Sequence, residues 1–600
     1  MEMIYMKKTF RKTASLILAA AIGALSFSSA IPAFAADEPI VIHVEHGETS
    51  EFGYQPYRYV DEDGNEVNFG QEEVLFTCSA NNLPAAYDAR EKGIITKVKN
   101  QGDAGNCWAH AAMSLMETSS VLKGYDTAED ADYSEAHLTW FTGKGLAEDE
   151  NDLAYGDGYD LEDPYNYGGN WKRAAGAMAR WSGVAEESEF PSYPRNVAAM
   201  GNYEEADRYN TSSGVILESA QALTDDNDVK QWIYENGSAT VAFCQNSKYL
   251  NKETAAYCCL ENYSVNHMIT IVGWDDDYPV ENFGTVKPSG NGAWLCKNSW
   301  GESWGDNGYF WLSYEDETTA LFAGFTAQQA DKYYKNYTYN GAEWNTAYGT
   351  YGSVQVANVF TATGNEKLTA VAVQTVGTNI RTRIKVYKGI ADGSTNPVGT
   401  TLAASCETVL EREGYHTIYL DSGVSLEKGE KFSVVAEYYN LDTKITFFPV
   451  EDRTVDCQFY SSREGESFVN YGTSANSWQT AASEEFNNVF VQAFTECAHK
   501  YAEKTEGVSC TEDGVKVTYC EQCGKVESET AVSHTGHSFG TWSQFKRNAD
   551  GDEISTRECI HCGKTETRKL SQMNVVTVDS LFETLFARFI EIFRSLFSLK

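Results

Sequence analysis

The chain has 600 residues, a formal net charge of −39 and an aromatic content of 13%. A single hydrophobic core does not grow to this size, so we expect several domains. The excess of negative charge would repel a polyanion, which excludes nucleic-acid binding as a general function.

The N-terminus has the pattern of a secretory signal peptide. Basic residues precede an apolar run at 14–30, and a small-residue cleavage pattern ends at Ala35. This pattern predicts that residues 1–35 are removed and that the protein is secreted or lies on a bacterial cell surface. An uncleaved membrane anchor is the alternative interpretation. Residues 36–82 are acidic and turn-rich, and we interpret them as an N-terminal extension or a short propeptide.

Residues 83–325 show helical periodicity first and strand-like runs later, which is typical of an α+β domain with two lobes around a cleft. Cys107 follows a glycine-rich turn and begins a helix predicted over 107–123. A helix N-terminus favours the thiolate, so this position predicts a reactive cysteine. The alternative is a buried structural cysteine. We favour a nucleophile because His267 and Asn298 can supply a base and an orienting amide.

Three segments around these residues resemble papain-like cysteine peptidases. Residues 83–109 are similar to the start of the mature enzyme, and residues 266–275 and 297–309 are similar to the histidine and asparagine boxes of that family. The resemblance implies a two-lobed papain-like fold and an enzyme that needs no cofactor. It also implies that Cys107 is the nucleophile.

The remaining roles follow from the same resemblance: His267 as the base, Asn298 as the residue that orients it, and Gln101 as an oxyanion donor. Trp300 would shield the Asn298–His267 hydrogen bond from water. The backbone of Gly168 and Gly169 would bind substrate as an added strand, with an ordinary turn as the alternative interpretation of this glycine pair.

His110 is a rival base, because it lies one turn after Cys107 on the predicted helix. A histidine inside a helix is more often a packing residue, and nothing on the helix would orient it. The sequence also departs from the family pattern at Ala104, where relatives carry a disulfide-forming cysteine.

Residues 328–496 contain alternating strand-like runs separated by turns, which predicts an all-β sandwich. The order of the two domains resembles bacterial exported peptidases in which a lectin-like β domain follows the papain-like domain. A cell-surface or glycan ligand is one interpretation of such a domain.

Residues 497–570 contain two related units, each with a Cys-x-x-Cys pair, which indicates an array of small modules. The four paired cysteines, Cys520, Cys523, Cys559 and Cys562, are candidate ligands of a structural zinc ion. The alternatives are disulfides, which an exported location favours, and reduced thiols. The pattern of residues 571–600 predicts an amphipathic helix whose apolar stripe is interrupted by charged residues. Peripheral membrane contact and partner binding are its possible roles. The stripe contains Leu581, Phe582, Leu585, Phe586, Phe589, Ile590, Phe593, Leu596 and Phe597.

The sequence therefore predicts an exported cysteine endopeptidase that acts on proteins or peptides through an acyl-enzyme on Cys107. Two alternatives remain at this point. One is a surface adhesin with a catalytically silent papain-like scaffold. The other is a cell-wall peptide amidase or transpeptidase of the same fold, since the acyl chemistry is shared.

Overall fold

The computed structural model describes residues 39–67, 83–145, 159, 161–192, 200–201, 203–452, 463–472, 477–481, 488–573 and 578–597. The predicted signal peptide and residues 68–82 of the extension lie outside these ranges. The chain divides into two compact units, Met1–Glu496 and Cys497–Lys600.

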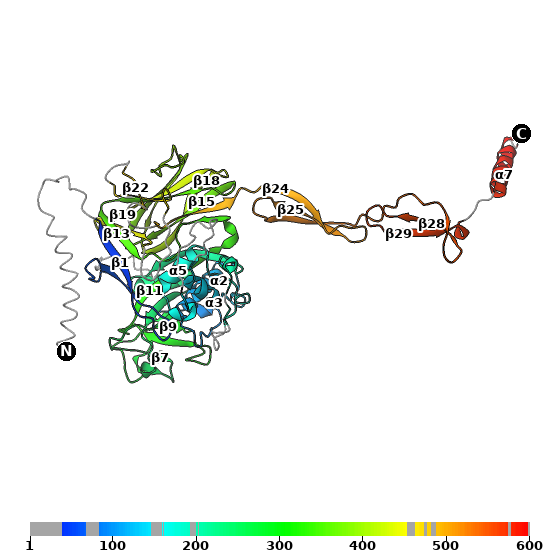
Figure 1. The fold of residues 1–600 in the computed structure, drawn as a ribbon. Coiled ribbons are helices and arrows are strands. Elements are labelled where there is room, and N and C mark those ends of the chain that lie inside the picture. Colours follow the sequence, from blue (N-terminus) through cyan, green and yellow to red (C-terminus); the bar gives the residue numbers. More distant parts are fainter. Residues whose placement is uncertain are drawn as a thin grey trace, which may run out of the picture. The chain divides into compact units, whose positions relative to one another are not determined.

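Most helices of the α+β part of the first unit precede its longer strands, and Figure 1 shows three of them, α2, α3 and α5, gathered together. The helices are α2 (Cys107–Leu122), α3 (Glu135–Gly143), α4 (Pro164–Tyr167), α5 (Trp171–Ala179) and α6 (Asp226–Asn236). The strands are β3 (Ala86–Asp88), β4 (Val215–Ala222), β5 (Ala239–Phe243), β6 (Leu250–Asn251), β7 (Ala256–Tyr257), β8 (His267–Asp275), β9 (Ala293–Lys297), β10 (Tyr309–Ser313) and β11 (Ala320–Gln329).

Helix α2 is the central element of this part. Its residues from Cys107 to Ser120 are all buried, because alanines, serines and methionines let strands and other helices approach from several sides. Side-chain oxygens cap two neighbouring helices, Ser134 at α3 and Asn170 at α5, and so satisfy N–H groups that a helix start leaves unpaired.

The all-β part contains the predicted strands in two main sheets. Its strands are β12 (Lys335–Tyr337), β13 (Thr346–Tyr351), β14 (Val354–Thr361), β15 (Glu366–Thr375), β16 (Ile380–Lys388), β17 (Thr401–Leu410), β18 (Gly414–Leu426), β19 (Lys431–Asn440), β20 (Ile445–Val450), β21 (Ser467–Asn470), β22 (Gln479–Thr480) and β23 (Val491–Cys497). One sheet has the order β17-β16-β19-β14-β21-β22. The other is continuous with the α+β part, because β18 pairs antiparallel with β4.

The N-terminal extension adds a hairpin to the all-β part. Strands β1 (Ile40–His46) and β2 (Tyr57–Asp61) pair with each other, and β1 also pairs with β13. Together with β20 they form a sheet of order β2-β1-β13-β20. Residues 47–56, which we call the covering loop, connect the two strands.

The second unit contains two three-stranded sheets, one for each predicted repeat. Strands β24 (Tyr501–Glu506), β25 (Gly514–Cys520) and β26 (Val526–Val532) form the first, and β27 (Lys546–Arg547), β28 (Glu553–Glu558) and β29 (Thr565–Lys569) form the second. Helix α7 (Val578–Phe597) follows, and its described apolar side chains are exposed. Among the described residues, no helix combines the length and apolar character needed to cross a membrane.

Candidate active site

Three elements bring the predicted catalytic residues together. Cys107 is the first residue of α2, His267 is the first residue of β8, and Asn298 directly follows β9. The Nε2 atom of His267 lies 2.8 Å from Oδ1 of Asn298, so the other ring nitrogen, Nδ1, is left for a second partner. The thiol of Cys107 receives a hydrogen bond from the backbone N–H of Met268, the residue after His267.

Two donors converge on one carbonyl oxygen beside Cys107. Gln101 Nε2 donates to the Phe52 carbonyl at 3.1 Å, and the backbone N–H of Cys107 donates to the same oxygen at 3.3 Å. Ser299 Oγ holds the Gln101 amide by donating to its Oε1 at 2.7 Å. The Phe52 carbonyl thus accepts from the predicted oxyanion donor, Gln101, and from the N–H of the predicted nucleophile, Cys107.

The covering loop also hydrogen-bonds with Gly169 of the glycine pair predicted to bind substrate, whereas the Gly168 carbonyl accepts from Arg173. Gly169 donates its N–H to the Gly53 carbonyl at 3.0 Å and accepts from the N–H of Gln55 at 2.9 Å. Gly169 packs so closely on Trp108 that an added Cβ would lie 2.7 Å from the indole ring, so only glycine fits here without a shift. The loop is held further by Ser50 Oγ, which donates to the Asn266 carbonyl at 2.6 Å.

Aromatic rings enclose the histidine. The Trp300 ring stacks on His267 with a centroid distance of 4.7 Å and an interplanar angle of 19°. Phe52 from the covering loop contacts both, at 5.3 Å from His267 and 5.2 Å from Trp300. His267 is fully buried as a result, which keeps water away from its hydrogen bond to Asn298.

Burial reverses the electrostatics predicted from the helix N-terminus. It raises the pKa of the Cys107 thiol to about 12, although the backbone N–H groups of Met268 and Trp108 act to lower it. Burial also lowers the pKa of His267 to about 4, in opposition to the hydrogen bond with Asn298. With the covering loop in position, the pair is therefore a neutral thiol and a neutral imidazole, because desolvation penalises both charges.

Two families match consecutive parts of this chain. Residues 83–327 match the papain family cysteine protease, and residues 336–495 match the lectin like domain. The chain carries a papain-family cysteine protease domain followed by a lectin-like domain.

Curated cysteine proteases match about 40% of this chain. Cathepsin F of Drosophila melanogaster is 28% identical over 247 residues, which are 40% of this chain and 34% of that protein. Cysteine proteinase 1 of Entamoeba histolytica is 26% identical over 251 residues, which are 40% of this chain and 66% of that protein. The chain thus spans between about a third and two thirds of the length of these relatives.

Solved structures of a clostridial protein match both domains. The cysteine protease Cwp84 after propeptide cleavage has a TM-score of 0.59 at 27% identity, with 69% of this chain and 99% of that chain covered. The protease and lectin-like domains of Cwp84, a surface layer associated protein of Clostridium difficile, have a TM-score of 0.61 at 24% identity, with 78% and 100% covered.

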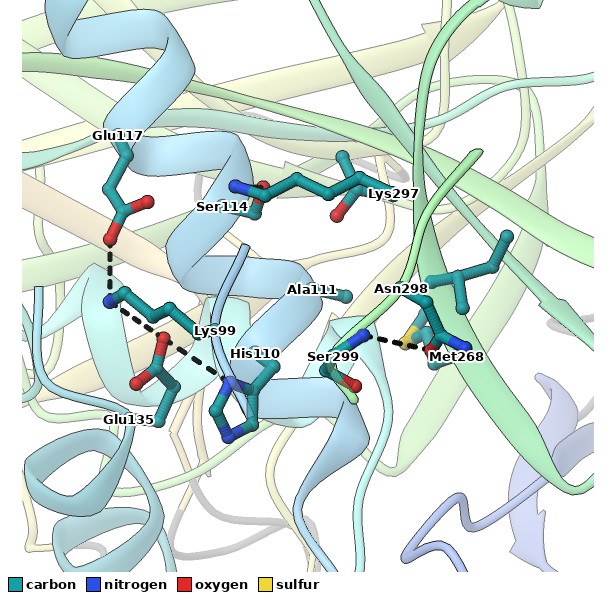
Figure 2. A pocket seen from close by; sticks show the side chains of 12 residues that line it. Lys99, His110, Ala111, Ser114, Glu117, Glu135, Met268, Lys297, Asn298 and Ser299 are labelled. Atoms are coloured by element: carbon teal, nitrogen blue, oxygen red, sulfur yellow. Dashed lines mark hydrogen bonds and ion pairs between the residues drawn. The ribbon is translucent and has the colours of Figure 1, made fainter. Parts of the chain in front are cut away.

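His110 lines a buried cavity of the protease domain that Asn298 and Ser299 also line (Figure 2). Its Nδ1 is 3.5 Å from Glu135 Oε1, and Glu135 pairs with Lys99 at 2.9 Å. Burial and the charge of Lys99 lower the pKa of His110 to about 3. The cavity between His110, Lys297 and Asn298 has about 20 Å³ of accessible volume, enough for one water molecule.

The four cysteines that we expected to hold one zinc ion do not form one group. Cys520 and Cys523 lie with Cys497 and His499, whereas Cys559 and Cys562 lie with Cys510 and His537. The single-site expectation is wrong because each Cys-x-x-Cys turn belongs to its own three-stranded sheet, and the four ligand atoms of each group gather within 4.8 Å of one another.

The sequence did not identify the covering loop. Its main contact residues, Ser50, Phe52 and Gly53, reach partners far along the chain, and the loop has no helical or strand periodicity. The available signal is Gly53, which has a φ of +89° and lies against the backbone of Gly105. A position of this kind favours glycine, but only the folded structure reveals its neighbour.

Proposed function

We propose that this chain is an exported cysteine endopeptidase that is held latent by its own covering loop. The observation that carries the proposal is the convergence of Gln101 Nε2 and the Cys107 N–H on one carbonyl, beside a His267–Asn298 pair. A nucleophile, an oriented base and two oxyanion donors are the groups that acyl transfer by a thiol requires.

In the uncovered site, the Cys107 proton passes to His267 and the thiolate attacks the carbonyl carbon of a peptide bond. The developing oxyanion accepts from Gln101 and the Cys107 N–H. His267 then gives its proton to the leaving amine, which leaves a thioester on Cys107. A water molecule attacks the thioester while His267 takes its proton, and the acid product departs as the Cys107 thiol is restored.

Asn298 fixes the ring of His267 through Nε2, so that Nδ1 carries the proton between thiol and substrate. Trp300 supports this arrangement by stacking on the ring and limiting water access. Gly169 offers one N–H and one carbonyl, and these are the groups that an extended peptide needs to bind as an added strand.

Latency follows from the position of the covering loop. Phe52 fills the oxyanion site, Gly53 and Gln55 use the hydrogen bonds of Gly169, and the ring of Phe52 covers His267. A substrate needs the same partners, so it competes directly with the loop. Release of the loop would also rehydrate Cys107 and His267 and so favour the charged pair.

The lectin-like domain anchors the covering loop at both of its ends. Strand β1 pairs with β13 in register from Ile40 opposite Gly349 to His43 opposite Thr346. At the other end, the Tyr59 ring of β2 stacks on Trp344 with a centroid distance of 5.4 Å, and its hydroxyl donates to Glu413. We therefore assign this domain a structural role in latency beside any cell-surface or glycan ligand.

Export and surface location are part of the proposal. They rest on the predicted signal peptide over 1–35 and on the likeness to Cwp84, whose description names it a surface layer associated protein. Proteins or peptides are the proposed substrates, and the exposed apolar face of α7 is proposed to contact a membrane surface or a partner.

An epoxide thiol inhibitor and a peptide library test the activity. We expect the chain that begins at residue 68 to be labelled at Cys107 and to cleave peptides under reducing conditions. The Cys107→Ala chain is the control and should do neither. If the wild-type chain without residues 39–67 is folded yet remains unlabelled and inactive, the protease assignment fails.

The full chain tests latency separately. We expect slow labelling of Cys107 while residues 39–67 are present and fast labelling after they are removed. Equal rates would refute latency and leave the protease assignment intact. Cleavage between Phe52 and Gly53 in the full chain would show that the loop is a substrate and not a stable cover.

A further inference from the structure

Each repeat of the second unit gathers three thiols and one imidazole. The first group contains Cys497, His499, Cys520 and Cys523, and the second contains Cys510, His537, Cys559 and Cys562. All eight residues lie outside the proposed catalytic machinery, and the cysteines among them are free thiols.

Two distances within the first group match the edges of a metal-centred tetrahedron. Zn–S bonds of about 2.3 Å and Zn–N bonds of about 2.0–2.1 Å give S···S edges of about 3.8 Å and S···N edges of about 3.5 Å. Sγ of Cys497 lies 3.7 Å from Sγ of Cys520, and Sγ of Cys523 lies 3.4 Å from Nδ1 of His499.

The second group repeats this geometry with different chain connections. Sγ of Cys510 lies 3.7 Å from Sγ of Cys559, and Sγ of Cys562 lies 3.3 Å from Nδ1 of His537. The S···S and S···N distances are thus nearly the same in the two groups, although Cys497 and Cys510 occupy different places in the repeats. Cys510 belongs to the loop between β24 and β25 of the first repeat, so this group joins residues of both repeats.

The Cys-x-x-Cys turns present backbone N–H groups to the first cysteine of each pair. The Gln522 N–H lies 3.4 Å from Sγ of Cys520. Three thiols beside one imidazole form a donor set that suits a soft or borderline cation.

The two small sheets also lack a hydrophobic core. Among the described side chains of residues 497–573, the buried apolar ones are Cys510, Val517, Cys520 and Cys559. Modules of this size need metal ions or disulfides to fold, because they bury too little apolar surface. Disulfides within a group of three cysteines would leave one thiol and the histidine unused.

We propose that the second unit binds two structural Zn²⁺ ions, each through three cysteines and one histidine, and that the second ion links the two repeats. Zinc fits because each set offers three sulfur ligands and one nitrogen ligand, which is the donor set of a four-coordinate structural site with no open position. Each ion displaces the protons still bound to its thiols and takes no part in peptide hydrolysis.

Metal analysis of the full Cys107→Ala chain tests the proposal, since this background removes zinc bound to the active-site thiol. After reduction, loading with Zn²⁺ and removal of excess metal, elemental mass spectrometry should find two zinc ions per chain. Cys497→Ser and Cys510→Ser should each retain one, and the double variant none. Cys406→Ser, a cysteine on β17, is the matched control and should retain two.

Substitution of Cys510 distinguishes two zinc sites from one site shared by the four paired cysteines. If one ion is shared by the four paired cysteines, Cys510→Ser leaves the metal content unchanged and the proposal fails. It fails equally if peptide mapping of the protein as exported finds these cysteines in disulfides and no zinc. Cys510→His keeps a ligand and should restore two ions, which separates a lost ligand from a misfolded unit. Peptide hydrolysis in the Cys107-containing chain should not change with Cys510→Ser.

Discussion

The contact between Gly53 and Gly105 gives a sharp test of the proposed latency. A Cβ added to Gly53 would lie 1.9 Å from the backbone carbonyl atoms of Gly105, and the φ of Gly53 is +89°. In Gly53→Ala, the left-handed backbone costs about 1–2 kcal/mol. Overpacking against a backbone that cannot rotate away costs a further 1–3 kcal/mol or so. We expect the docking free energy of the covering loop to fall by about 2–5 kcal/mol.

This loss predicts a rise of about 30-fold to several thousand-fold in the uncovered fraction, since about 1.4 kcal/mol corresponds to a factor of ten. The rise stops at the value of a chain that lacks the loop. The rate of Cys107 alkylation by iodoacetamide, followed by mass spectrometry of the peptide that contains Cys107, measures this fraction. Cys107 is fully buried, so it must be uncovered before it reacts.

Gly64→Ala is the matched control. Gly64 lies in the turn after β2 with a φ of +81°, and a Cβ there meets nothing within 4 Å. The substitution therefore adds similar backbone strain without the clash, and the alkylation rate should stay near that of the wild type. Equal rates in the two variants, or a Gly53→Ala chain as slow as the wild type, would refute the reasoning.

Three further predictions concern the site itself. Gln101→Ala should reduce kcat of the loop-free enzyme by about 10²–10³, because one oxyanion donor is lost; an unchanged kcat would remove Gln101 from the mechanism. His267→Ala should abolish turnover, whereas His110→Ala should retain a substantial part of it, and steady-state kinetics that gave the reverse order would overturn the choice of base. Burial lowers the pKa of His267 to about 4 from its ordinary value of 6.5. Between pH 4 and pH 6.5 the uncovered state therefore binds more protons than the covered state. Lowering the pH in this range weakens docking of the loop by up to about 1.4 kcal/mol per pH unit. Hydrogen exchange of residues 47–56 in Cys107→Ala, corrected for intrinsic rates, should show protection falling from pH 6.5 to pH 4; constant protection would contradict this linkage.

Local sequence signals predicted the elements that position the site. The helix expected over 107–123 is α2 (Cys107–Leu122), and the strand-like runs expected later in residues 83–325 include β8 (His267–Asp275). A glycine-rich turn, an apolar helix and a buried strand carry their pattern within a few residues, so their positions follow from local chemistry. The order of the two domains was also readable, and both family matches agree with it.

The electrostatics of the site were not readable in the same way. The helix N-terminus predicts a lowered pKa for Cys107, but burial raises it to about 12. Part of that burial comes from Phe52 and Tyr54, which lie in a different part of the chain and reach the site through the covering loop. A local dipole is visible in the sequence, whereas desolvation depends on contacts that only the fold creates.

The anchoring of the covering loop explains how a short segment can act as a cover. A free peptide pays the entropy of association and of ordering its backbone when it binds. Here β1 pairs with β13 at one end, and Tyr59 stacks on Trp344 at the other, so both ends are fixed before the loop docks. Docking is then an intramolecular step with a high effective concentration. The few hydrogen bonds made by Phe52 and Gly53 therefore do not have to offset the full entropy of association. Loss of either anchor weakens the cover without altering any residue that touches Cys107.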